Sequence, residues 1–121
     1  MFEIIFYQDS KGRSSILDYL DELKASGSKN SRVKLDKILY CIRLLEEQGR
    51  GLNMPHARHL DGEIWELRPS NDRTLFAGFI GNQFVLLHCF EKKTQKTPRR
   101  EIEKAKRELA DMRERTGAHG G

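Results

Sequence analysis

The stretch from Phe84 to Pro98 constrains this chain most, because an apolar strand there runs directly into a basic segment and stops at a proline. The pattern predicts a core strand that delivers cationic and hydroxyl side chains to one edge of a sheet. From Lys92 to Arg100, five basic residues and no acid occupy nine positions. Such a run attracts phosphate. The alternative is a solvated strand end followed by the start of a helix.

Length and composition favour one small domain without bound metal. A chain of 121 residues can bury a core without disulfides, and we expect residues 1–115 to form it and residues 116–121 to be a disordered tail. Cys41 and Cys89 lie in apolar segments, as buried thiols of a reducing compartment do. No His, Cys and carboxylate set has metal-ligand spacing, so we expect neither metal nor cofactor. No apolar run nears the ~20 residues that a membrane helix needs, so we expect a cytoplasmic protein without a membrane partner.

Periodicity in the first half predicts one strand and two helices. Alternation over residues 2–7 is typical of a strand with one buried face. Ser14 or Ser15 could cap a helix that runs through about Ser26, with Gly27 as its stop. Apolar residues recur at helical spacing from about residue 30 to residue 48, which predicts a second, antiparallel helix. Residues 51–62 contain a proline and no periodic pattern, which predicts a loop.

The second half predicts a meander of three strands and a final helix. The strands are expected at residues 63–68, 73–80 and 84–91, with Gly81-Asn82 as a tight turn between the last two. Pro98 suits the first position of a helix, with Thr97 as its cap. The order β-α-α-β-β-β-α predicts an α+β fold, a small antiparallel sheet with the helices packed on one face.

Three motifs carry a family resemblance: Ile64-Trp-Glu-Leu-Arg68, Arg73-Thr-Leu-Phe76 and Lys92-Lys-Thr-Gln-Lys-Thr-Pro98. With them in this order, nearly the whole domain resembles the HigB-type toxins of the RelE superfamily. The resemblance implies a RelE-like fold and a ribosome-dependent endoribonuclease, the toxin of a type II toxin–antitoxin pair. Such an mRNA interferase cuts mRNA in the ribosomal A site by attack of the ribose 2′-OH, without a metal. The implied partners are the ribosome, its mRNA and a HigA-like helix-turn-helix antitoxin.

The resemblance also implies a site. Arg68 and Arg73 match the sheet arginines of the family, and the lysines of the last motif match its terminal basic segment. The expected catalytic residues are Arg68, Arg73, Lys93 and Lys96, and the expected RNA-binding residues are Arg58, Lys92, His56 and His59. The alternative for the two sheet arginines is a salt bridge to Glu66 or Asp72. The alternative for the lysines is surface solubility.

Two departures from the family pattern bear on chemistry. Asp72 stands before Arg73 where an aromatic is common, which thins the surface on which a base could stack. No tyrosine follows Tyr40, so the motif assigns neither the general acid nor the general base. His88 lies inside the apolar strand and is expected to be a hydrogen-bonded core residue on the same face as Leu86 and Phe90.

Two further functions compete with the toxin. A non-catalytic module could use the same basic face to bind RNA or a protein. A transcription regulator is disfavoured because no helix-turn-helix pair carries basic residues on a recognition helix. The sequence leaves open the base preference, the antitoxin docking surface and the oligomeric state of the complex.

Overall fold

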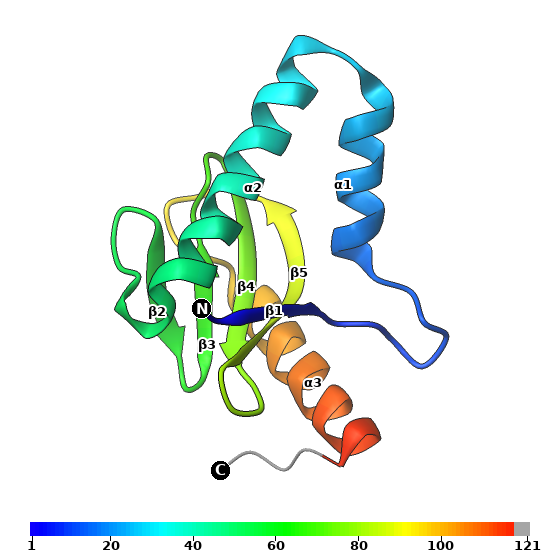
Figure 1. The fold of residues 1–121 in the computed structure, drawn as a ribbon, viewed down its shortest axis with the longest axis vertical. Helices are drawn as coiled ribbons and strands as arrows, with labels where there is room; N and C mark the ends of the chain where they lie inside the picture. The colour runs from blue at the N-terminus through cyan, green and yellow to red at the C-terminus, as the bar shows by residue number, and fades with distance from the viewer. Residues whose placement is uncertain (118–121) are drawn as a thin grey trace.

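The computed structural model describes residues 1–117, in which a five-stranded sheet is flanked by three α-helices (Figure 1). The elements follow the chain as β1 (Glu3–Phe6), α1 (Ser15–Ser26), α2 (Lys29–Gln48), the 3-10 turn η1 (Gly49–Gly51), β2 (Ala57–Asp61), β3 (Ile64–Leu67), β4 (Asp72–Gly78), β5 (Gln83–Glu91) and α3 (Arg99–Thr116). The predicted α+β class is confirmed. Helix α3 extends to Thr116, the first residue of the tail that was expected at residues 116–121. Residues 118–121 lie outside the described part.

The two early helices form as their caps predict. The Ser14 hydroxyl accepts a hydrogen bond from the Leu17 amide at 3.3 Å, and Gly27 ends α1 in the left-handed conformation. The Ser28 hydroxyl accepts from the Ser31 amide at 3.1 Å and starts α2. These bonds satisfy amides that the first turn of a helix leaves unpaired. The resulting hairpin projects past the sheet at its tip (Figure 1).

The sheet has the strand order β1-β5-β4-β3-β2, and one of its pairings is parallel. β1 runs parallel to β5, with Glu3 opposite Gln83, whereas the other neighbours are antiparallel. The expected antiparallel sheet therefore holds for β2 to β5 but not for β1. Between β1 and β5 the chain passes through α1, α2 and the strands β2 to β4, and parallel pairs need such a long crossover connection.

The predicted loop at residues 51–62 was wrong in its second half, which contains β2. Ala57 pairs with Leu67 and His59 pairs with Trp65 across the β2–β3 hairpin. β2 has a neighbour on one side only, and its charged and polar residues are typical of an edge strand. They also hide the alternation by which a strand is recognised. The element order is therefore β-α-α-β-β-β-β-α.

The helices cover both faces of the sheet, not one face as expected. α1 and α2 pack on the face that presents Leu67, Phe76, Phe84 and Leu86. α3 packs on the opposite face, where Ala105 and Leu109 meet Ile64, Leu75, Val85 and Leu87. The sheet is thus the middle of three layers, and apolar residues on both sides of β4 and β5 make these strands nearly continuous in hydrophobicity. No helix within residues 1–117 has the length and apolar composition that crossing a membrane requires.

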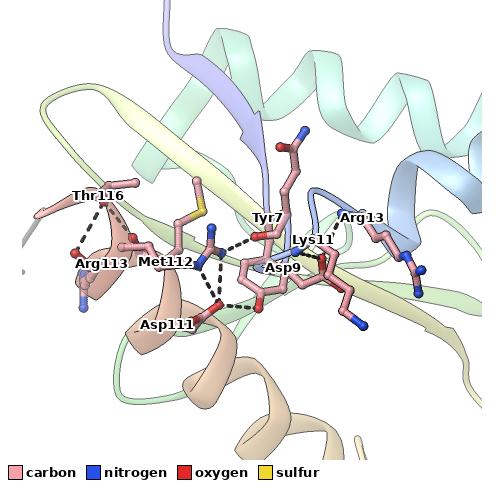
Figure 2. Close-up of polar contacts among 10 residues, drawn as sticks. Tyr7, Asp9, Lys11, Arg13, Asp111, Met112, Arg113 and Thr116 are labelled. Atoms are coloured by element: carbon pink, nitrogen blue, oxygen red, sulfur yellow. Dashed lines mark hydrogen bonds and ion pairs between the residues drawn. The ribbon is translucent and has the colours of Figure 1, made fainter.

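A polar network fastens the end of β1 to the last turns of α3. The Tyr7 hydroxyl donates to Asp111 Oδ2 at 2.7 Å, as Figure 2 shows. Arg115 donates to the same carboxylate at 3.0 Å and lies over the Tyr7 ring, 5.8 Å from its centroid. Burial, followed by the bond to Asp111, raises the pKa of Tyr7 to about 12. The two ends of the described chain are therefore joined.

Candidate functional site

A buried carboxylate organises the arginines on the α3 face of the sheet. Glu66 lies on β3 opposite Arg58 of β2, and its side chain is 0% exposed. Its Oε2 accepts from Arg68 Nη1 at 2.9 Å and lies 3.2 Å from Arg58 Nη2. Its Oε1 accepts from the Thr97 hydroxyl at 2.5 Å and lies 3.9 Å from Arg73 Nε. Three guanidinium groups thus converge on one carboxylate.

Arg73, at the start of β4, is the most buried of these cations at 7% exposure. Its Nη1 donates to the backbone carbonyls of Ser70 at 2.5 Å and Asp72 at 2.9 Å. Its buried Nε has no hydrogen-bond partner within residues 1–117. Desolvation, followed by the charge of Arg68, lowers the pKa of Arg73. An anion placed beside this guanidinium would accept a hydrogen bond from it and would favour its charged form.

An open cavity of about 470 Å³ lies in front of Arg73, lined also by Asn71, Lys92, Lys93, Thr94 and Gln95. The amide of Lys92 donates to the Asn71 carbonyl at 2.7 Å, which ties the end of β5 to the β3–β4 connection. Desolvation, followed by the charge of Arg73, lowers the pKa of Lys92. The lining contains no acid, so the cavity offers cations and amide or hydroxyl groups, the donors that bind a phosphodiester.

The structure brings together most of the predicted site residues but not all of them. Arg68 and Arg58 share Glu66, and Arg73, Lys92 and Lys93 line the cavity. Lys96 is exposed and does not line it, although the Lys96 carbonyl accepts from Thr94 at 2.7 Å. The expected alternative of a salt bridge to Glu66 is also realised, closely for Arg68 at 2.9 Å and more loosely for Arg73 at 3.9 Å.

His56 and His59 lie away from the cavity, on the side of α1 and α2. The His59 ring packs against Trp65 with centroids 5.2 Å apart, and its Nε2 lies 2.7 Å from the Gly62 carbonyl. The His56 ring meets Tyr40 of α2 edge to face at 5.9 Å. His59 is not grouped with Arg58 because successive residues of β2 point to opposite faces of the sheet. His56 is not grouped with Arg58 because it precedes β2 and packs against α2.

His88 is a hydrogen-bonded core residue, as predicted, and is 1% exposed. Its Nδ1 lies 2.5 Å from Glu108 Oε1 and its Nε2 lies 3.0 Å from Glu101 Oε1, which ties β5 to α3. It shares its face with Phe90, but the expectation for Leu86 was wrong. A register shift in the β4–β5 pairing between Leu75 and Phe76 turns Leu86 to the opposite core, as a β-bulge does.

The sequence indicated Glu66 only as a salt-bridge partner of the sheet arginines, and it did not indicate the bond between Glu66 and Thr97. Thr97 was expected to cap the last helix, but Pro98 is the N-cap residue of α3, without a side-chain hydrogen bond, and the Thr97 hydroxyl reaches Glu66 instead. Glu66 stands two residues before Arg68, and this spacing was a weak signal because a solvent-exposed Glu–Arg pair would have the same spacing. Within residues 1–117, no group of three or more His, Cys, Asp and Glu side chains is placed to hold a metal ion.

Comparison with solved structures supports the fold. A chain of the YoeB-YefM complex from Staphylococcus aureus superposes with a TM-score of 0.52 and 12% identity, covering 78% of this chain and 99% of that chain. A heterotetrameric complex of the YoeB-YefM toxin-antitoxin from the same organism gives the same values. The chain therefore shares the fold of these chains. The comparison with curated proteins finds no match.

A protein-family comparison covers most of the domain. The matching family is described as Phage derived protein Gp49-like (DUF891), and the match spans residues 5–110. These residues include the end of β1, all of β2 to β5, both early helices, the cation cavity and most of α3. The chain belongs to the Gp49-like family of phage derived proteins.

Proposed function

We propose that this protein is a HigB-type toxin, an endoribonuclease that cleaves mRNA on the ribosome. The observation that carries the proposal is the cavity in which Arg73, buried and with an unpartnered Nε, faces the same space as Lys92 and Lys93. The cavity lies at the start of β4 and the end of β5, in a YoeB/RelE-like fold. The motifs that carry the HigB resemblance lie at the same two places in the sequence. The solved relatives are toxin-antitoxin complexes, which supports the same class.

In the proposed reaction, the ribose 2′-OH attacks the adjacent phosphate and the 5′-oxygen leaves. The phosphorane that forms between these steps carries more negative charge than the ground state. Cations fixed before the reaction and aimed at that charge lower the barrier by several kcal/mol. Arg73 and Lys93 are proposed to contact the scissile phosphate, Lys92 a flanking one, and Lys96 the RNA backbone outside the cavity. The proposal leaves the general acid and the general base without a named side chain.

Recognition of RNA and neutralisation follow from the same surface. Arg68 and Arg58, partly exposed beside the cavity, extend the positive field that attracts a phosphate backbone. We propose a HigA-like helix-turn-helix antitoxin that covers this field, and a cytoplasmic site of action where ribosomes translate. His56 and His59 would then contact RNA only if the substrate also reached the α2 side of β2.

The test uses purified protein and ribosomes programmed with a defined mRNA, and maps cleavage by primer extension. We expect cleavage by the wild type and strong loss in the double variant Lys92→Ala/Lys93→Ala. The matched control is Lys24→Ala/Lys29→Ala at the tip of the α1–α2 hairpin, which removes the same charge from residues that do not line the cavity. Salt-dependent RNA binding without cleavage would favour a non-catalytic module instead. Neither binding nor cleavage would overturn both functions.

A further inference from the structure

We propose that Glu66 is a positioning residue that sets the shape of the cation cavity. The inference rests on the anion site of the proposed function. Through its two oxygens, Glu66 joins the arginines of the sheet to the segment 92–97 that carries the lysines. We call this segment the lysine segment. Glu66 is not among the residues that line the cavity, so it acts on the anion only through other side chains.

The two carboxylate oxygens of Glu66 contact different parts of the protein. Oε2 holds Arg68 and Arg58, which come from neighbouring strands, and Oε1 holds the Thr97 hydroxyl at the far end of the lysine segment. A fully buried carboxylate is costly unless donors surround it. Here these donors fix it in place, so the group is a rigid link between sheet and segment.

The lysine segment is attached to the rest of the protein by two anchors, one hydrogen bond at each end. At its start, the Lys92 amide donates to the Asn71 carbonyl, and at its end Thr97 donates to Glu66. Between the anchors, residues 93–96 are exposed, and the side-chain hydrogen bond described there joins Thr94 to the Lys96 carbonyl. Loss of the second anchor would free Lys93 from its place opposite Arg73. A displacement of about 1 Å is enough to reduce catalysis by a large factor.

Burial separates positioning from base catalysis. A general base must come within hydrogen-bond reach of the proton it removes. The Glu66 side chain is 0% exposed, and its oxygens already accept hydrogen bonds from Arg68 and Thr97 and form an ion pair with Arg58. The carboxylate also offsets part of the repulsion among Arg58, Arg68 and Arg73. Its removal should therefore disturb anion binding as well as turnover.

The first experiment removes the anchor without touching the charge. Thr97→Val deletes the hydroxyl at nearly constant volume, and Thr97→Ser restores it. The matched control is Thr116→Val in the last turn of α3, where the hydroxyl bonds to the Met112 carbonyl. We expect Thr97→Val to weaken binding of inorganic pyrophosphate roughly tenfold, the scale of one hydrogen bond to a charged group. Amide hydrogen exchange in residues 92–97 should become faster. Thr97→Ser and Thr116→Val should match the wild type.

The second experiment asks whether Glu66 and Thr97 act as one unit. We expect the double variant Glu66→Gln/Thr97→Val to lose no more pyrophosphate affinity than Glu66→Gln alone, because contacting residues are not additive. In the ribosome assay, Glu66→Gln should lower the rate but keep the pH profile of the wild type. A lost acidic limb would mark Glu66 as the base and overturn positioning.

The outcomes distinguish this inference from the proposed function. Unchanged pyrophosphate affinity and unchanged exchange in Thr97→Val would overturn the positioning role, whatever the cleavage result. A wild type that binds pyrophosphate as expected, responds to Thr97→Val, but never cleaves mRNA on ribosomes would overturn the nuclease and keep the positioning role. Should Glu66→Gln not fold, the three threonine variants still decide.

Discussion

Replacement of Arg73 by alanine separates two roles that the structure gives to one side chain. The guanidinium holds the carbonyls of Ser70 and Asp72 and also faces the cation cavity. Each hydrogen bond from a charged donor contributes about 1.5–3 kcal/mol, and release of a desolvated cation offsets part of this sum. We expect Arg73→Ala to lower the free energy of unfolding by about 2 kcal/mol, which lowers Tm by roughly 5–12 °C.

The effect on cleavage should exceed the effect on folding. Loss of one preorganised donor to a developing charge costs about 2–4 kcal/mol of transition-state stabilisation, which slows single-turnover cleavage about 30- to 1000-fold. Ribosome affinity should fall much less, because the ground-state phosphate has other cationic neighbours. Arg73→Lys should restore only part of the rate, since an ammonium lacks the two-pronged geometry of a guanidinium.

A matched arginine elsewhere controls for the stability term. Arg115 donates to the Gln8 carbonyl and to Asp111, so Arg115→Ala also removes an arginine that binds a backbone oxygen, but far from the cavity. Both variants are compared with the wild type by thermal unfolding and by single-turnover cleavage on programmed ribosomes, below the lower Tm. Wild-type cleavage by folded Arg73→Ala would refute the assignment of this residue. Equal losses in both variants would reduce its role to stability.

Three further outcomes are expected. Expression without an antitoxin should arrest growth, and normal growth at verified soluble expression would contradict the toxin proposal. Cleavage should survive a zinc chelator when ribosomal magnesium is kept constant, because the proposed chemistry uses fixed cations; recovery only upon added zinc would refute this. Burial raises the pKa of Cys89 from about 9 to about 12, so the stability that its protonated thiol contributes is fully present below pH 9 and is lost as the pH rises toward 12. Alkylation of Cys89 at pH 8 should be slow in the folded protein and fast in urea, and equal rates would contradict this expectation.

The sequence predicted the elements that local rules determine and missed those that depend on distant neighbours. Ser14 and Gly27 mark α1 because capping needs only adjacent residues. β2 was missed because an edge strand is stabilised by one partner, and Arg58 and His59 break its apolar alternation. The face of Leu86 depends on a bulge in a pairing that no single strand encodes. The family resemblance indicated the arginines and lysines of the site. The link that Glu66 makes between them is visible only in the structure, which places Glu66 of β3 beside Thr97.

The parallel pairing of β1 with β5 has a consequence for synthesis. Glu3 meets Gln83, 80 residues later, and Tyr7 meets Asp111, 104 residues later. Contacts of such sequence separation form late and slowly. During translation, β1 has no strand partner until β5 has been made, which completes the sheet, and the lysine segment is made after β5. Under the proposed function, the chain therefore cannot become a nuclease until the lysine segment has left the ribosome and has joined the sheet.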